Sequence, residues 1–304
     1  MLIARLIADT SRQETGVREP GALERRLDQA GKVFAARSMP LASATLLDVG
    51  EPVIELRFAE GTPSTAIGVI EQFFAPVDLL VAEDDIVVPR LFVSDMDSTM
   101  IGQECIDELA DYAGLKEPIA AITERAMRGE LDFADALHER VALLEGLEQS
   151  AIERCLEERI VASPGAAVLV ATLKSLGCRC VLVTGGFHHF ADVVAEMLGF
   201  DRVVGNRLAV EDRKLTGKLE GDISDAGTKL ATLRSEAEAF GANARTCAAG
   251  DGANDIPMIE AADYGFAYRA KPKARAAANG RIERAELTPM LSLLGVQRRD
   301  WVEG

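Results

Sequence analysis

The sequence has few cysteines and no long apolar segment. Its five cysteines are odd in number and scattered through 304 residues, so a disulfide framework is not expected. Cys178 and Cys180 lie one residue apart, but no second pair completes a metal site, and we expect both to pack in a core. No apolar run reaches the roughly 20 residues that a membrane-spanning helix needs. Because a secretory signal pattern is also missing, we expect a cytoplasmic protein.

Positive charge is scarce as well. The chain has 33 Lys and Arg residues against 49 Asp and Glu residues, which gives a formal net charge of -16. Binding to nucleic acid requires a basic face that displaces counterions from phosphates, so nucleic-acid partners are not expected. The same charge argues against anionic membranes. A phosphorylated metabolite remains compatible with this charge if a local cation offsets it.

The spacing of apolar residues divides the chain into two regions. Residues 1–85 alternate strand and helix patterns in the order βαββαβ, which is the ferredoxin-like order. Residues 86–304 alternate continuous apolar strands with helices, which predicts an α/β domain with a Rossmann-like open parallel sheet. The stretch at about 103–162 is helical throughout and would form a cap over the end of the first strand. Residues 202–221 alternate like a β-hairpin.

Four carboxylates follow apolar strands of the second region. Asp95 and Asp97 lie at the end of the expected strand 86–95, where an extended backbone would point both side chains to one side. Asp251 and Asp255 lie in the run GDGAND after another strand. Carboxyl ends of parallel strands meet at one edge of a sheet, and carboxylates gathered there repel one another unless a cation is bound. Either motif alone is more often an ordinary turn, but together they favour a Mg²⁺ site.

Two further features suit a phosphate group. Thr184 and Gly185 begin the run TGG after an apolar strand and before a helix, where a hydroxyl and open backbone N–H groups can hold phosphate oxygens. Lys229 begins a later helical segment. A pair of glycines is often a plain turn and a lone lysine is usually solvated, so neither feature decides the function alone.

The order of these motifs resembles a known family. DMDST, TGG, Lys229 and GDGAND are similar to the four motifs of the haloacid dehalogenase superfamily, and most similar to those of its phosphoserine phosphatases. The cap segments ECIDELA, ITERAMRGELDF and LHERVALLEG share this resemblance, which covers about residues 90–295. It implies Mg²⁺-dependent hydrolysis of L-phosphoserine to L-serine and phosphate through an aspartyl-phosphate, the last step of serine biosynthesis.

The resemblance also implies catalytic roles. Asp95 would attack phosphorus as the nucleophile. Asp97 would protonate the leaving oxygen and then deprotonate the hydrolytic water, while its backbone carbonyl binds the metal. Asp251 and Asp95 would be the carboxylate ligands of the metal. Asp255 would support both the metal site and Lys229, which acts on the phosphoryl group.

Substrate contacts follow from the same resemblance. The residues that would hold the phosphoryl oxygens are Thr184, Gly185, Lys229 and Asn254. In the cap, Glu104 would pair with the substrate ammonium and Arg140 with its carboxylate, since a zwitterion requires an acid and a base set apart. Met127 and Phe133 would pack beside them. Family members usually have serine where this chain has Thr184, and the hydroxyl is retained.

Other functions stay open at this point. The same chemistry could act on another small phosphomonoester, or transfer the phosphoryl group to a different alcohol. Residues 1–85 resemble a regulatory module of the ACT type, which can bind amino acids or dimerise, so a homodimer is compatible with the sequence. The chain could also be an amino-acid sensor without catalysis. The four matched groups Asp95, Asp97, Lys229 and Asp251 favour the enzyme.

Overall fold

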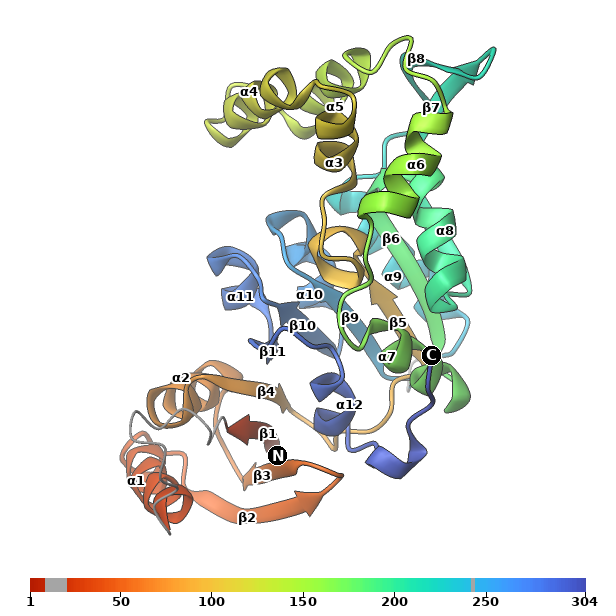
Figure 1. Ribbon diagram of the computed structural model, residues 1–304. Helices are drawn as coiled ribbons and strands as arrows, with labels where there is room; N and C mark the ends of the chain where they lie inside the picture. Colours follow the sequence, from red (N-terminus) through yellow and green to blue (C-terminus); the bar gives the residue numbers. More distant parts are fainter. Residues whose placement is uncertain (9–20, 242–243) are drawn as a thin grey trace.

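The computed structural model describes residues 1–8, 21–241 and 244–304, apart from the side chain of residue 127. Its named strands form one 11-stranded sheet in the order β2-β3-β1-β4-β11-β10-β9-β5-β6-β7-β8. Figure 1 shows the N-terminal strands at one end of the molecule, the core in the middle and a group of helices at the other end.

The N-terminal region has the predicted βαββαβ order. Its elements are β1 (Leu2–Ala8), α1 (Ala22–Ala36), β2 (Leu41–Asp48), β3 (Pro52–Phe58), α2 (Pro63–Phe74) and β4 (Val77–Ala82). All three strand pairs in this region are antiparallel. Phe34 of α1 and Phe74 of α2 are fully buried in one apolar cluster with Leu6 and Leu79. The two helices therefore cover one face of these strands.

The N-terminal strands continue directly into the core sheet. β4 pairs antiparallel with β11 (Gly280–Ile282), where Leu80 lies opposite Gly280. The second face of β1 and β4 is also covered, because Ile3 and Leu80 share an apolar cluster with Leu291 of the C-terminal helix α12 (Pro289–Leu293). The two ends of the chain are thus packed together.

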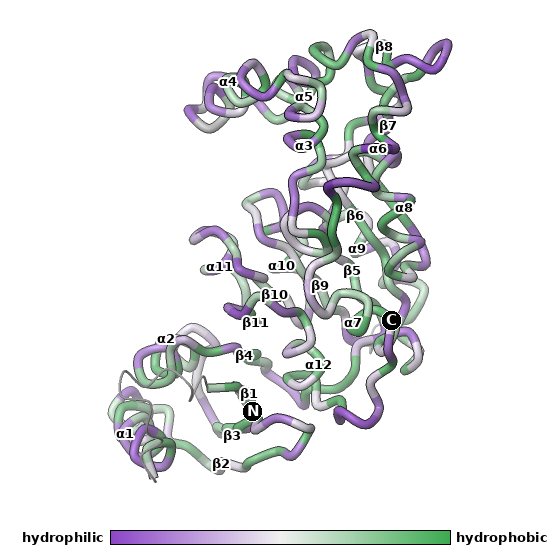
Figure 2. Tube along the Cα trace, in the orientation of Figure 1, coloured by the Kyte–Doolittle hydropathy of each residue, from purple (hydrophilic) through white to green (hydrophobic). Residues whose placement is uncertain are grey.

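The core is the predicted parallel α/β sheet. Its parallel strands are β11, β10 (Tyr264–Tyr268), β9 (Thr246–Gly250), β5 (Leu91–Ser94), β6 (Arg179–Phe187) and β7 (Arg202–Glu211). Helices α7 (Ala166–Ser175) and α8 (His188–Leu198) pack on one face through Leu169 and Phe190. Helices α9 (Ala226–Glu238) and α10 (Ile256–Ala261) pack on the other through Leu233 and Met258. Figure 2 shows hydrophobic residues along β1, β4 and β6.

The first core strand is shorter than expected. The sequence predicts a strand over 86–95, whereas β5 spans only Leu91–Ser94. Pro89 has no N–H to donate to a neighbouring strand, and the N–H of Val87 is bonded to the Tyr264 hydroxyl instead. The short strand β11 carries no periodic signal in the sequence, because three residues are too few to show one.

Four helices form the cap between β5 and α7. They are α3 (Cys105–Tyr112), α4 (Lys116–Met127), α5 (Phe133–Ala142) and α6 (Ser150–Arg159), which agrees with the expected helical stretch. A β-bridge between Ile101 and Ala162 joins its two connections to the core. The predicted hairpin is formed by β7 and β8 (Lys214–Glu220) and turns at Asp212 and Arg213, both at positive φ.

Two features of the composition are reflected in the structure. All five cysteines are buried and free, which agrees with the expected packing role of Cys178 and Cys180. Within the described ranges, no helix is both long and apolar enough to cross a membrane.

Candidate active site

The two acidic residues after β5 lie on a turn. The strand ends at Ser94, and a hydrogen bond from the Ile101 N–H to the Met96 carbonyl closes a turn over Met96–Met100. The backbone is extended at Asp95 and at Asp97 and becomes left-handed at Ser98, with φ 55°. Both Asp95 and Asp97 line the same pocket.

Lys229 lies beneath this turn and is completely buried. Its Nζ is 2.6 Å from Oδ1 of Asp95 and 2.6 Å from Oδ1 of Asp255. It lies in the first turn of α9, which is capped by Asp225 through a hydrogen bond from the Thr228 N–H. Burial disfavours the ammonium, but the charges of Asp95 and Asp255 raise the Lys229 pKa above its usual value. Lys229 is therefore a fixed positive charge beside Asp95.

The GDGAND run forms the neighbouring loop. Oδ2 of Asp255 accepts hydrogen bonds from the N–H groups of Asp251 and Gly252 at 3.1 and 3.0 Å. This loop needs glycine at position 250, because a Cβ there would lie 2.4 Å from Cγ of Asp255. Carboxylate oxygens of Asp95, Asp251 and Asp255 lie within 4.8 Å of one another.

This group of carboxylates could hold a metal ion. Both oxygens of Asp255 already have partners, whereas Oδ2 of Asp95 and Oδ1 of Asp251 have no hydrogen-bond or ion-pair partner among the described residues. The donors are all oxygen atoms, which suits a hard divalent cation. The geometry thus fits Asp95 and Asp251 as ligands and Asp255 as their support.

The TGG run lies inside β6, which continues to Phe187 rather than ending before the glycines. Thr184 Oγ1 accepts a hydrogen bond from the Gly186 N–H at 2.8 Å and donates to Oδ2 of Asp97 at 3.4 Å. A Cβ at Gly186 would lie 2.9 Å from this Asp97 oxygen. The glycines therefore let the β6 backbone approach the carboxylates closely.

Two residues that the sequence reasoning missed hold this part of β6. The Asn206 amide donates to the carbonyl of Gly185 at 2.7 Å, and its oxygen accepts from the N–H of Ser224 at 2.8 Å. The Ser224 hydroxyl donates to the carbonyl of Thr184 at 2.8 Å. Asn206 lies in the hairpin segment NRL, so the only signal for it was a polar residue in an alternating strand.

Asp97 and Glu104 connect the core to the cap. Oδ1 of Asp97 accepts the N–H of Cys105 at 3.0 Å, and Glu104 accepts the Ser98 hydroxyl at 2.8 Å. Burial raises the pKa of Asp97 above its usual value despite these hydrogen bonds. Loss of hydration within the pocket raises the pKa of Glu104 to about 7, and the negative charge of Asp97 adds to this shift. The Glu104 side chain nevertheless lines the open pocket.

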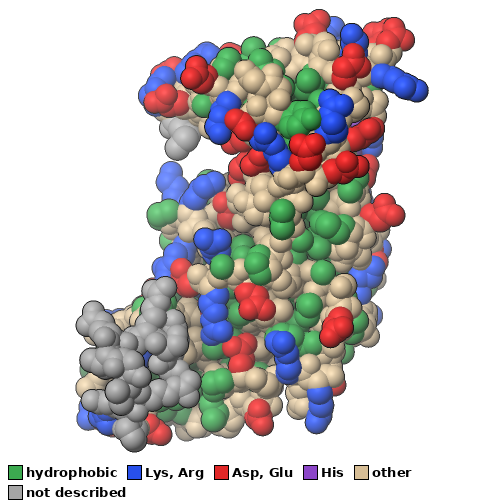
Figure 3. Space-filling view, viewed as in Figure 1, with side chains coloured by type: hydrophobic (Ala, Val, Ile, Leu, Met, Phe, Trp, Pro, Cys, Tyr) green, Lys and Arg blue, Asp and Glu red, His purple; other side chains and the backbone are tan. Residues whose placement is uncertain are grey.

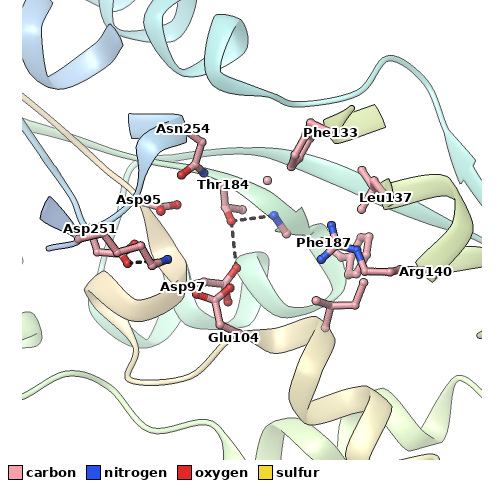
Figure 4. Close-up of a pocket in the computed structure, with 14 residues that line it drawn as sticks. Asp95, Asp97, Glu104, Phe133, Leu137, Arg140, Thr184, Phe187, Asp251 and Asn254 are labelled. Atoms are coloured by element: carbon pink, nitrogen blue, oxygen red, sulfur yellow. Dashed lines mark hydrogen bonds and ion pairs between the residues drawn. The ribbon is translucent and has the colours of Figure 1, made fainter. Parts of the chain in front are cut away.

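The cap supplies the opposite wall of the pocket. Phe133, Leu137 and Arg140 project from α5 (Figure 4), and Asn254 and Asp251 lie on the core side. Arg140 forms no ion pair among the described residues, and burial lowers its pKa. The structure thus brings the predicted cap and core residues into one pocket. Residue Met127 ends α4, and its side chain lies outside the described part of the chain.

Comparisons with known proteins agree with this geometry. A family model for haloacid dehalogenase-like hydrolases matches residues 92–260. The chain is 37% identical over 284 residues to phosphoserine phosphatase of Streptomyces coelicolor, across 92% of this chain and 68% of that protein. The chain belongs to the phosphoserine phosphatases of the haloacid dehalogenase-like hydrolase family.

Solved structures of this family share the fold. A haloacid dehalogenase family hydrolase from Salmonella enterica serovar Typhi has a TM-score of 0.80 at 25% identity and is matched over 96% of this chain and 98% of that chain. A phosphoserine phosphatase determined as an analogue of its phospho-aspartyl intermediate has a TM-score of 0.62 at 38% identity. That match covers 67% of this chain and 98% of the other.

The pocket of this family member has further lining residues that the sequence reasoning did not assign. They are Ile106, Leu137, Gly186, Phe187 and Lys271. Leu137 could have been found, since it is four residues after Phe133 and three before Arg140 on one helix face. Lys271 lies outside every motif that carried a role, so only the folded chain connects it with Asp251.

Proposed function

We propose that this chain hydrolyses L-phosphoserine to L-serine and phosphate through an aspartyl-phosphate. The observation that carries the proposal is the position of Asp95, whose carboxylate is held by buried Lys229 at the floor of the pocket. Glu104, which precedes the first cap helix, and Arg140 of α5 line the same pocket. A phosphorylated amino acid matches both ends of such a pocket.

In the proposed reaction, an Asp95 oxygen forms a bond to phosphorus while the bond from phosphorus to the serine oxygen breaks. Asp97 gives its proton to that oxygen and later takes one from the water that hydrolyses the aspartyl-phosphate. The raised pKa of Asp97 supports the first of these roles. Lys229, Thr184 and the backbone of Gly185 would offset the charge on the phosphoryl oxygens, together with Asn254.

We propose Mg²⁺ as the metal. Asp95, Asp251 and the backbone carbonyl of Asp97 would hold it, with Asp255 as support. When bound, Mg²⁺ supplies positive charge that offsets the phosphoryl oxygens and the surrounding carboxylates. The free oxygens of Asp95 and Asp251 support this set.

Substrate selection would come from the cap. Arg140 is half-buried and has no acidic partner within the described chain. Its guanidinium can form a bidentate ion pair with a carboxylate. Glu104 would pair with the ammonium group. The Phe133 ring lies close to Gly185, since a Cβ added there would be 3.3 Å from it. With Met127, Phe133 would pack beside the amino-acid part of the substrate.

The test is phosphate release from L-phosphoserine and a panel of other phosphomonoesters, with Mg²⁺ or with chelator. We expect phosphoserine to lead the panel, and activity to vanish with chelator and in Asp95→Asn. Asp222→Asn is the matched control, since Asp222 is exposed and does not line the pocket. Hydrolysis of the panel without preference for phosphoserine would overturn the substrate, and no metal-dependent release would overturn the chemistry.

We further propose that residues 1–85 form an ACT-like module that binds an amino acid, and that residues 86–304 form the catalytic domain. The βαββαβ order and the strand order β2-β3-β1-β4 support this division. Calorimetric titration of Asp95→Asn, which should not hydrolyse phosphoserine, with L-serine alone and with phosphoserine in excess would reveal a second binding event. Sedimentation with and without serine would test whether the module forms a homodimer.

A further inference from the structure

A second cavity lies beside the active-site pocket. It is open to solvent and is lined by the two cap connections, residues 98–103 and 161–164, and by the loop 268–271 between β10 and α11 (Pro272–Ala277). Its volume of about 440 Å³ far exceeds the roughly 30 Å³ of one water molecule. Asp251 and Lys271 line both spaces, so the cavity meets the active-site pocket at these two side chains.

The lining of this cavity suits an anion. Its charged residues are Arg269, Lys271 and Asp251. Hydroxyls come from Ser163, Tyr268 and Ser98, the last of which donates to Glu104. Lys271 Nζ lies 3.3 Å from Oδ2 of Asp251 and offsets that carboxylate. Arg269 is exposed and forms no ion pair with any residue that the structure describes. Its side chain interacts with the Tyr268 hydroxyl. In a chain of net charge -16, an exposed guanidinium without an acidic partner attracts an anion.

The backbone at Arg269 supports a functional role for its side chain. Arg269 has φ 44°, a left-handed conformation that is costly for any residue with a Cβ and easy for glycine. Hydrogen bonds hold the loop in this form, from Arg269 N–H to the Ile282 carbonyl and from Lys271 N–H to the Asp251 carbonyl. The chain therefore keeps an arginine where glycine would be less strained, which is typical of functional positions.

We propose that this cavity is a second anion site, which takes inorganic phosphate on Arg269 and Lys271. Arginine binds phosphate oxygens at two points with charge-assisted hydrogen bonds. Phosphate released beside Asp251 would meet Lys271 first and then Arg269, beneath the cap connections and away from the amino-acid side of the pocket. Figure 3 shows a notch below the cap helices with Lys and Arg side chains along the α11 side. The source of the phosphate rests on the proposed function, but its binding does not.

The test counts the phosphate ions bound by the full chain, by equilibrium dialysis with Mg²⁺ present and no phosphoserine. We expect two ions per chain, one in each space. Arg269→Gln should weaken the second site by about tenfold or more. Arg207→Gln is the matched control, because Arg207 is exposed on β7, lines neither space and forms no ion pair among the described residues. If Arg269→Gln neither loses nor weakens a phosphate ion that the wild type binds, whether the wild type holds one ion or two, the proposal is overturned.

Arg269→Gly separates binding from folding. This variant relieves the left-handed strain, so we expect it to unfold at a temperature no lower than the wild type and still to lose the second phosphate. In kinetics, phosphate should inhibit the wild type by a mixed mechanism and Arg269→Gly by competition alone. A stable glycine variant that binds two phosphates would refute the site. If phosphoserine were not hydrolysed, the proposed function would fail, while the count of bound ions would still decide this inference.

Discussion

Replacing Lys229 by methionine removes the central charge of the site and keeps most of its packing. Lys229 is 0% exposed and lies 2.6 Å from oxygens of both Asp95 and Asp255. Methionine has a similar length, so the methylene contacts remain. Two buried carboxylates are then left without their cation, and each must either stay charged at high cost or take up a proton.

The magnitude follows from the remaining partners. Removing one member of a buried ion pair costs about 3–5 kcal/mol. Two carboxylates lose a partner here, but Asp255 keeps two backbone N–H donors and Asp95 keeps the N–H of Met96. We therefore expect a loss of about 3–5 kcal/mol rather than twice that. At about 2–4 °C per kcal/mol for chains of more than 150 residues, the Tm falls by about 6–20 °C.

The assay is thermal unfolding at neutral and acidic pH, in chelator. In Lys229→Met the folded-state pKa of the two carboxylates lies above the unfolded value, so the folded variant binds more protons. Its deficit against the wild type should therefore shrink as the pH falls. Lys218→Met, at an exposed position of β8, is the control and should change stability by less than about 0.5 kcal/mol. If Lys229→Met and Lys218→Met had the same Tm, the buried charge of Lys229 would not stabilise the site.

Three further predictions concern substrate binding and support. Arg140→Ala should raise KM for phosphoserine about 10- to 100-fold more than KM for a phosphomonoester without a carboxylate, and equal effects would contradict the assigned contact. Because the Glu104 pKa is raised to about 7, kcat/KM for phosphoserine should rise with pH through that value, and Glu104→Gln should remove this rise. Asn206→Ala leaves the carbonyl of Gly185 and the N–H of Ser224 unpaired, so it should lower both Tm and kcat, measured by unfolding and by single turnover.

The sequence predicts the parts of the site that depend on short motifs. Asp95 and Asp97 share one local turn, and Asp251 and Asp255 share one loop, so their mutual approach requires only that parallel strands end at a common edge. The helical cap was also predictable, because each of its helices has its own periodic pattern of apolar residues. The catalytic and binding roles themselves remain predictions.

Other features depend on contacts between distant segments. The amide of Asn206 reaches Gly185 across two strands, and no local pattern marks that hydrogen bond. The pairing of Leu80 with Gly280 joins positions 200 residues apart through a strand of three residues. In each case the decisive energy comes from tertiary packing and not from local propensity.

The join between the N-terminal strands and the core also decides how the proposed regulation can be studied. Glu71 of α2 forms ion pairs with Arg275 of α11 and Arg281 of β11. Helix α11 begins directly after Lys271, which pairs with Asp251, so this segment connects the N-terminal region with the pocket. Deleting residues 1–84 would uncover β11 and the apolar face around Leu291, and its effects would mix lost folding energy with lost regulation. Glu71→Gln keeps all the strands of the sheet and removes the charge that Arg275 and buried Arg281 share. Its activity, compared with its own unfolding temperature and with the deletion, asks whether the N-terminal region acts on the site.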